Sequence, residues 1–324
     1  MTLSLDRFRG VVLSQIPRVL GLGDRDPSSE TYGCFDRTYW HYRLIDFANV
    51  RFQEASWLLA LLYSTNFEGN LYYRNEKIKQ WTEAAIRFWI SQRHRDGSFD
   101  EAYPNERGFC VTAFSTLAVT ESMLLLGSDL ESSLEKTGEW LSRHTNPDVS
   151  NQMAASAWAL LNLYRLTHEK RYLSASQEKL SVLLSSQDPS GYFAEYGGAD
   201  LGYLSVTISY LAHYWKRTQE ASLLKSIRRA VAFLEEKVDE EGNYDCSRGS
   251  RKTQFLYPYG AAVTESPLLE RLSRGLERGT VLNPVWLDDR YFTQLTIDYL
   301  ETYLFSLSRE PSEAWAGADG ESHT

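Results

Sequence analysis

Helical periodicity runs through nearly the whole chain, and two kinds of segment alternate along it. In the first kind, apolar residues recur on one face only, as where Ile78, Trp81 and Ile86 interleave with charged residues. In the second kind almost every position is apolar or small, as in 153–161. The pattern predicts six amphipathic helices, at 4–20, 76–94, 130–144, 171–186, 219–237 and 266–278, and six apolar helices that follow them, at 46–64, 108–126, 150–166, 202–217, 253–265 and 290–307.

This alternation predicts an all-α fold, an (α/α)6 toroid of six helical hairpins. An inner ring of apolar helices inside an outer ring of amphipathic helices buries every apolar face once the sixth pair meets the first. A linear solenoid of the same hairpins is the alternative, and it needs polar outer faces on its terminal repeats. We expect one toroid domain over 1–309, followed by a loose tail over 310–324 that is rich in Glu, Ser, Gly and Ala.

A glycine–aromatic turn between the helices occurs three times, around Gly97, Gly191 and Gly242. In each copy the next apolar segment begins eleven residues after the glycine. Repeats of roughly 40–50 residues are typical of stacked or circular helical arrays. Because all three turns lead into the starts of inner helices, we expect them to lie on one face of the ring and to frame a shared pocket.

Composition and charge narrow the classes of ligand. The 324 residues carry a net charge of -9, which is opposite to the basic footprint of a nucleic-acid-binding protein. Three isolated cysteines indicate a reducing compartment and match no zinc spacing. No apolar run approaches the ~20 residues of a membrane span, and charges interrupt the first twenty residues. We therefore expect a cytoplasmic protein with a small-molecule or oligosaccharide ligand, no membrane insertion, no metal and no cofactor.

The approach to the first apolar helix, residues 36–54, interleaves charged and aromatic side chains. The alternative to a functional role is a capping segment, in which Asp46 caps the helix and Arg43 pairs locally. A functional role makes His41, Tyr42 and Asn49 candidate catalytic residues, and Trp40, Arg43, Arg51 and Gln53 candidate substrate-binding residues.

The repeated turns place carboxylates at one repeat position, because Glu101 and Glu195 each follow their turn glycine by four residues. Two carboxylates that flank a sugar bond are the arrangement of glycoside hydrolases. The alternative is that both accept backbone N–H bonds at helix starts. The turns and the neighbouring helix approaches add Tyr196 and Tyr203 as catalytic candidates, and Tyr103, Arg107, Asn151 and Gln152 as binding candidates.

A basic cluster follows the third turn of this acidic chain. Arg248 and Arg251 lie three residues apart, and two nearby arginines clamp a carboxylate or sulfate through paired hydrogen bonds. A solvated loop is the alternative. Tyr257, Tyr259 and Arg290, at the approaches to the last two inner helices, complete the predicted binding set.

The segment Tyr192-Phe193-Ala194-Glu195-Tyr196-Gly197-Gly198-Ala199-Asp200-Leu201-Gly202-Tyr203 resembles toroid proteins of the heparinase-like polysaccharide lyase family. The similarity extends loosely through 248–251 to 287–290. It implies cleavage of uronic-acid polysaccharides by β-elimination, which needs a neutraliser for the substrate carboxylate, a base and an acid. By this resemblance Asn49, Gln53, Asn151 or Gln152 neutralises the carboxylate, and His41, Tyr42, Tyr196, Tyr203 or Tyr257 transfers protons.

A second resemblance concerns the turn Gln92-Arg93-His94-Arg95-Asp96-Gly97-Ser98-Phe99, which is similar to a structural turn of terpene cyclase and prenyltransferase toroids. The acidic Asp-x-Asp-Asp pattern of class II terpene cyclases is absent, since Trp286 precedes Leu287-Asp288-Asp289 where the first Asp would stand. We therefore predict a carbohydrate-active enzyme, of lyase, epimerase or hydrolase type, that acts on an acidic, uronic-acid-containing oligosaccharide. The alternatives are a non-catalytic binding or scaffold protein and an isoprenoid cyclase or transferase.

Overall fold

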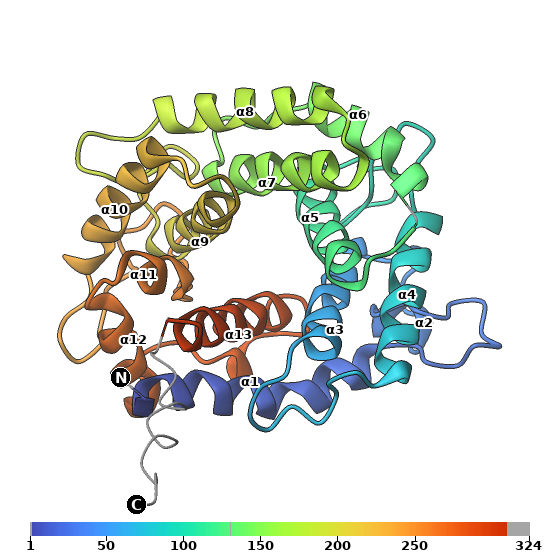
Figure 1. Cartoon of the computed structure of the whole chain (residues 1–324), viewed down its shortest axis with the longest axis horizontal. Coiled ribbons are helices and arrows are strands. Elements are labelled where there is room, and N and C mark those ends of the chain that lie inside the picture. The colour runs from blue at the N-terminus through green and yellow to red at the C-terminus, as the bar shows by residue number, and fades with distance from the viewer. Residues whose placement is uncertain (1, 130, 310–324) are drawn as a thin grey trace, which may run out of the picture.

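The computed structural model describes residues 2–129 and 131–309, and within these ranges it contains helices and no β-strand. Figure 1 shows two concentric rings of helices. The outer ring consists of α1 (Thr2–Leu22), α4 (Glu76–Ser91), α6 (Glu135–Arg143), α8 (Lys170–Ser185), α10 (Ala221–Glu235) and α12 (Leu268–Arg278). The inner ring consists of α3 (Ala55–Ser64), α5 (Phe109–Leu126), α7 (Ser150–Thr167), α9 (Leu201–Thr218), α11 (Tyr259–Thr264) and α13 (Phe292–Leu307).

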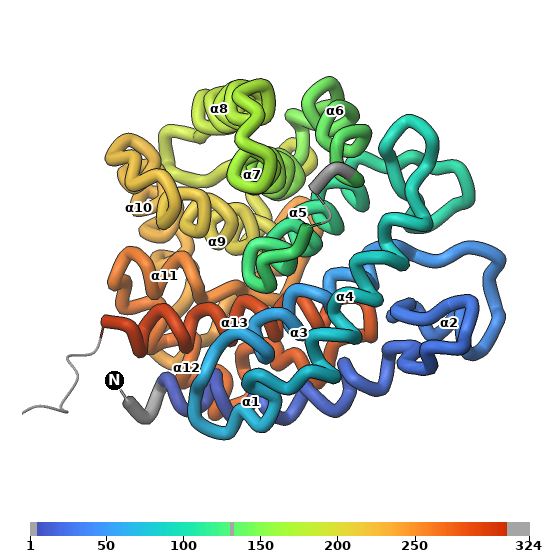
Figure 2. Tube along the Cα trace, turned by 45° about the vertical axis from the view of Figure 1, so that its right-hand side comes forward, coloured from blue at the N-terminus to red at the C-terminus, as the bar shows by residue number. Residues whose placement is uncertain are grey.

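The ring is closed, because the first helix packs against the last pair. In Figures 1 and 2, α1 runs beside α13 and meets α12. The Phe8 ring meets the edge of Tyr299 with 5.0 Å between centroids, and Arg18 donates to Asp289 at 2.9 Å. The prediction of an (α/α)6 toroid of six hairpins is confirmed, and the predicted tail over 310–324 lies outside the described residues.

Four shorter elements connect the helices of the two rings. The short helix α2 (Arg37–Trp40) lies outside the outer ring, beside α4 (Figure 1). Three 3-10 turns are η1 (Val50–Glu54), η2 (Glu131–Leu134) and η3 (Pro284–Trp286). The turn η1 leads directly into α3 and thereby fixes the approach to the first inner helix.

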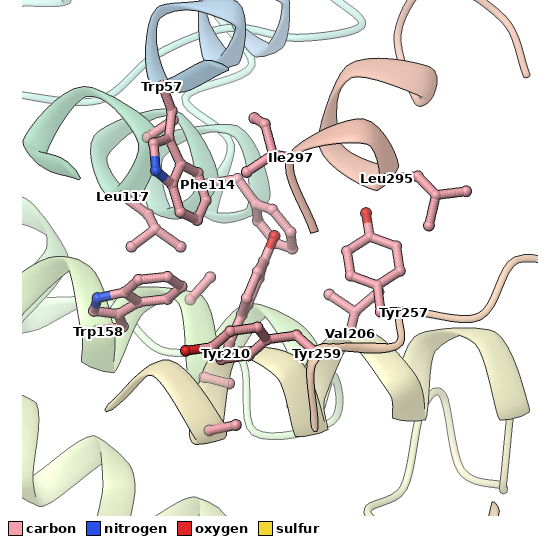
Figure 3. Packing of buried hydrophobic residues seen from close by; sticks show 14 of the residues in the cluster. Trp57, Phe114, Leu117, Trp158, Val206, Tyr210, Tyr257, Tyr259, Leu295 and Ile297 are labelled. Carbon is pink, nitrogen blue, oxygen red and sulfur yellow. The ribbon is translucent and has the colours of Figure 1, made fainter. Parts of the chain in front are cut away.

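The centre of the ring is filled by aromatic side chains, several of which are labelled in Figure 3. The ring of His213 stacks on Trp158 at 4.5 Å and on Tyr259 at 3.7 Å. Trp57 meets Trp158 edge-on at 5.4 Å. Because these rings occupy the axis, a cavity at one end of the toroid is separated from the other end.

The inner helix α5 is long and apolar enough to cross a membrane by length and composition, and most of it is buried inside the ring. Its apolar surface contacts the neighbouring helices, α3 and α7 among them. The burial explains why the helix lacks a polar face.

The three repeated turns dock on the outer helix of the next hairpin. Gly97, Gly191 and Gly242 all have positive φ, of +104°, +110° and +81°. A Cβ at Gly191 would lie 2.5 Å from the carbonyl oxygen of Arg229, in α10. The other two turns contact the backbone of α6 and α12 in the same way. Glycine is therefore required twice over, by its conformation and by the close approach of backbones.

The prediction of a helix over 253–265 is wrong for its first half, because only Tyr259–Thr264 is helical. The preceding backbone donors bond instead to side chains at the start of α9. Thr253 N donates to Asp200 at 3.1 Å, and Tyr257 N donates to Ser205 Oγ at 2.9 Å. Pro258 has no N–H to give. The segment 253–258 is consequently extended across the starts of the inner helices.

Candidate functional site

A cavity of about 230 Å³ lies at the N-terminal ends of the inner helices. Every hairpin contributes to it, either through an inner helix or through the segment that leads into one. Eight of its lining residues belong to the predicted set, namely Arg51, Asn151, Gln152, Tyr196, Tyr203, Arg251, Tyr257 and Arg290. The remaining lining residues are Cys110, Phe114, Val206, Phe255, Tyr291 and Gln294.

The lining is cationic and aromatic. It contains three arginines, four tyrosines and three side-chain amides, and none of the described residues that line it is Asp or Glu. The nearest carboxylates are partners of the arginines. Glu54 forms an ion pair with Arg51, and Glu101 forms one with Arg290 and lies 3.8 Å from Arg51.

Arg251 differs from the other two arginines. Its guanidinium lies over the Tyr196 ring, 4.5 Å from the centroid, and it forms no ion pair with any residue of 2–129 or 131–309. Its backbone N–H donates to Asp200 at 3.0 Å, which holds the loop in place. Arg251 is thus a positioned cation whose charge is available to a ligand.

Arg51 is the buried arginine of the site. Its Nη1 lies 3.2 Å from the Cys110 thiol, and its Cζ lies 4.1 Å from the centre of the Phe114 ring. Burial raises the pKa of its partner Glu54, and the charge of Arg51 offsets part of that rise. Glu54 lines a narrow extension of the cavity that shares Tyr257 and Gln294 with it.

Asn151 is held from behind by Glu195, which is fully buried. The Glu195 carboxylate accepts from Asn151 N and from Asn151 Nδ2, each at 2.8 Å, and from Thr207 at 3.1 Å. Burial raises the pKa of Glu195 to about 8, against these hydrogen bonds. The contacts leave the amide oxygen of Asn151 free to accept from a ligand.

The tyrosines of the site are neutral donors. Burial raises the pKa of Tyr203 and of Tyr257 above the ordinary value, so both phenols keep their protons at neutral pH. Tyr257 donates to Gln294 Oε1 at 3.5 Å. Tyr196 is half-exposed at the mouth and has a φ of +54°, a conformation that costs a non-glycine residue free energy.

The structure places the 36–43 region away from the cavity. Trp40, in α2, donates from its indole to the carbonyl of Leu22 at 2.8 Å. His41 lies between the rings of Trp40 and Tyr42, and Tyr42 and Arg43 follow it on the exposed side. These four predicted residues therefore form a group of their own beside α4.

Two further residues of that approach have structural contacts. Asn49 caps η1 by accepting from Arg51 N at 3.0 Å. Gln53 is buried and bonds three backbone groups, those of Phe35, Gly33 and Ala85, at 2.8 to 3.0 Å. Neither amide lines the cavity: Asn49 holds the backbone of Arg51, and Gln53 fixes η1 to the loop before it and to α4.

The other predicted residues outside the lining have separate surroundings. Tyr103 is exposed, and Arg107 pairs with Asp96 at 3.1 Å. Arg248 is exposed on the loop that carries Arg251. Tyr259 is buried against His213 at the centre of the ring. Glu101 pairs with Arg290, as described above.

Glu54 and Gln294 are the functional candidates that the sequence analysis missed. Glu54 follows Arg51 by three residues, and Gln294 follows Arg290 by four, so helical spacing alone would have placed each beside its arginine. No group of three or more His, Cys, Asp or Glu side chains within the described ranges is arranged to hold a metal ion.

Comparison with known proteins identifies the fold and no family. No protein-family model matches the sequence, and no curated protein matches it. A family 76 glycoside hydrolase from a bovine Bacteroides thetaiotaomicron strain is similar in structure, with a TM-score of 0.60, 12% identity, and coverage of 94% of this chain and 78% of that one. A polysaccharide lyase has a TM-score of 0.58 and 11% identity, with 93% and 98% covered.

A type II terpene cyclase from Scytonema is also similar, with a TM-score of 0.51, 10% identity, and 94% and 99% covered. The structural neighbours thus include carbohydrate-active toroid enzymes and terpene cyclases, the two groups that the sequence motifs resemble. At these identities the similarity shows the toroid fold. A closer relation to heparinase-like lyases stays a prediction.

Proposed function

We propose that this protein is a carbohydrate-active enzyme that binds an acidic sugar in the cavity at the N-terminal ends of the inner helices. The observation that carries the proposal is the lining itself, to which the described residues contribute three arginines, four tyrosines and no carboxylate. Tyrosine rings pack against sugar rings, and arginine pairs with a uronate carboxylate through two hydrogen bonds.

Arg251 is the proposed partner of the substrate carboxylate. The other two arginines already face Glu54 and Glu101, whereas Arg251 packs on the Tyr196 ring and pairs with no acid in the part of the chain that the structure describes. Asn151 and Gln152 lie in the same lining and supply the amide groups that neutralisation of a uronate needs. Stabilising the charge that develops on the carboxylate lowers the barrier to removal of the adjacent proton.

The proton chemistry is assigned to Glu54 and the tyrosines. A carboxylate whose pKa is raised by burial is a stronger base than an exposed one, and Glu54 has that environment at the bottom of the site. Tyr203 and Tyr257 stay protonated and are suited to donate a proton to the departing or newly formed oxygen. Lyase and epimerase reactions both need this pairing of base and acid.

Hydrolase and isoprenoid activities receive less support from the geometry. A two-carboxylate hydrolase needs both acids beside the bond that is cleaved, and Glu101 and Glu195 both lie behind the lining. The three arginines could also bind a diphosphate. A hydrocarbon chain in this cavity, however, would leave the amides and phenols of the lining without hydrogen-bond partners. A non-catalytic binding protein would keep the same ligand preference without turnover.

The test is calorimetric titration with a uronate disaccharide and with its neutral counterpart, in which a hydroxymethyl group replaces the carboxylate. We expect the uronate to bind and Arg251→Gln to weaken it by about tenfold to a hundredfold, the loss of one charged hydrogen-bonded partner. Arg248→Gln, three residues away and outside the lining, is the matched control and should bind like the wild type.

Equal affinity for both sugars, or equal losses in both variants, would exclude Arg251 as a carboxylate receptor. If the uronate binds, ultraviolet absorbance of an unsaturated product distinguishes a lyase from an epimerase, which forms none. Stabilisation by a prenyl diphosphate alone would replace the proposal with the isoprenoid alternative.

A further inference from the structure

A second hollow, of about 540 Å³, opens at the other end of the ring, where the inner helices end. The last turns of α3, α5, α7, α9 and α13 frame it. The aromatic rings on the axis, among them Trp158, His213 and Tyr259, separate it from the candidate active site. Its apolar wall is made by Leu61, Leu125, Leu304 and Phe305, and its charged residues are Glu121, Arg165, Lys216, Arg217 and Glu301.

The charges of this hollow leave an excess of cations. Arg217 donates to both oxygens of Glu121 at 2.6 Å, and Asn162 donates to the same carboxylate at 2.7 Å, so that pair is internally satisfied. Arg165 has no hydrogen bond or ion pair with any residue in the described ranges. Lys216 lies 5.4 Å from the centre of the Phe305 ring. Glu301 alone remains to balance these two cations.

Three buried hydrogen-bond donors around the hollow lack an acceptor within the described chain. They are the indole N–H of Trp158, Nε of Arg217 and the hydroxyl of Tyr259. Arg217 lines the hollow, and its guanidinium lies 4.8 Å from the centre of the Trp158 ring. Trp158 and Tyr259 lie behind the lining, where both stack on His213, which does line the hollow. The Tyr259 ring also meets Phe305, 5.6 Å away.

A buried donor without an acceptor destabilises the folded protein, and most buried polar groups in folded proteins have a partner. Together with the cations, the three unmet donors favour an anionic ligand, because the lining holds three cations against the two carboxylates Glu121 and Glu301, and the unmet Nε of Arg217 lies in that lining. The only unmet acceptor among the described residues beside the Glu121 pair is Oδ1 of Asn162. We propose that this hollow is a second binding site, for a small organic anion whose carboxylate or phosphate accepts from these donors. Its apolar part then packs against the leucines and Phe305. The inference does not depend on the function proposed for the first cavity.

The experiment is calorimetric titration with benzoate and phenyl phosphate, with benzyl alcohol as the neutral probe. We expect at least one anion to bind and benzyl alcohol not to bind. The double variant Arg165→Gln/Lys216→Gln should weaken the anion at least tenfold, and Arg251→Gln, in the first cavity, should leave it unchanged. Absence of anion binding, equal binding of the neutral probe, or a loss confined to Arg251→Gln would overturn the proposal.

Tyr259→Phe separates a ligand-binding role from a structural one. Removing a hydroxyl that has no partner should raise the melting temperature of the free protein, or leave it unchanged, while the anion binds more weakly. A lower melting temperature with unchanged affinity would show that the hydroxyl has an acceptor in the folded protein, and the site would lose its donor. Comparing the affinities of benzoate and phenyl phosphate shows whether the site prefers a carboxylate or a phosphate as the acceptor.

Discussion

At the scale of single residues, the two equivalent carboxylates of the repeat have different partners. Glu101 faces Arg51 and Arg290 and balances charge behind the cavity. Glu195 instead accepts from the start of α7 and holds the Asn151 side chain. The same repeat position therefore supplies charge balance in one hairpin and a helix cap in another, since each carboxylate responds to the donors that its neighbours present.

The pH dependence of stability tests the cap formed by Glu195. Burial raises the pKa of this group to about 8, from an ordinary value of 4.5, so ionisation opposes folding. The associated stability is complete below the unfolded pKa and is lost as pH rises through about 8. In Glu195→Gln the side chain at this position has no proton to lose, so the variant keeps its stability while the wild type loses some as pH rises. The melting temperature of the variant minus that of the wild type should therefore increase between pH 5 and pH 9.

All other titrating groups are the same in the two proteins, so their pH dependence cancels when the two melting temperatures are subtracted. Melting curves that stay parallel across this range would mean that Glu195 ionises without cost. The same variant also examines Asn151. Since the glutamine NH2 group carries two N–H donors where the protonated carboxyl group carries one O–H, we expect the Asn151 amide to turn and uronate affinity to fall while helicity is retained.

At the scale of elements, the sequence predicts the helices well and the segments between them poorly. Periodicity identifies α7 and α9 within one or two residues, because a helix enclosed by others needs apolar residues throughout. The extended segment before α11 was missed, since its backbone bonds to Asp200 and Ser205, which are distant in sequence. Its Phe255 and Tyr257 reach the cavity for that reason.

The part of the candidate site that lies beside helix starts was predictable, because the helices themselves were. Residues beside the predicted helix starts, such as Asn151 and Arg290, line the cavity as expected. The aromatic-rich composition around His41 led to the prediction of a site there, yet α2, which precedes His41, packs outside the ring. Composition does not indicate the direction in which a loop leaves the ring, because tertiary contacts such as that of Trp40 with Leu22 decide it.

The docking of the repeated turn is testable by adding one methyl group. In Gly191→Ala the new Cβ would meet the Arg229 carbonyl and the residue would keep a φ of +110°. We expect a loss of about 2–5 kcal/mol in the free energy of unfolding, from backbone strain plus overpacking. Chemical denaturation measures it.

Gly197→Ala is the matched control. Gly197 has a φ of +83° in the same loop, and a Cβ there would meet nothing within 4 Å. It should cost only the conformational part, about 1–2 kcal/mol. Similar losses in the two variants would mean that close approach to α10 contributes little and that the repeated glycine serves conformation alone.

At the scale of the whole molecule, closure of the ring determines how local damage spreads. Each inner helix contacts two inner neighbours and an outer partner, and α1 supplies the partner that α13 lacks in its own part of the sequence. In a linear array, a defect in the first helix would loosen mainly the adjacent repeat. In a closed ring there is no terminal repeat, so opening the seam exposes apolar faces on both sides of it.

Phe8→Ala tests this cooperativity. Phe8 is fully buried and meets Tyr299 across the seam, so its truncation should cost about 3–5 kcal/mol. We expect hydrogen-exchange protection of α7, which lies across the ring from α1 (Figure 1), to fall by the same free energy as that of α13. Leu71→Ala, at an exposed position, should change neither helix. Protection lost at α13 and retained at α7 would show that the hairpins open one after another from the seam, and that closure adds packing without making the ring a single folding unit.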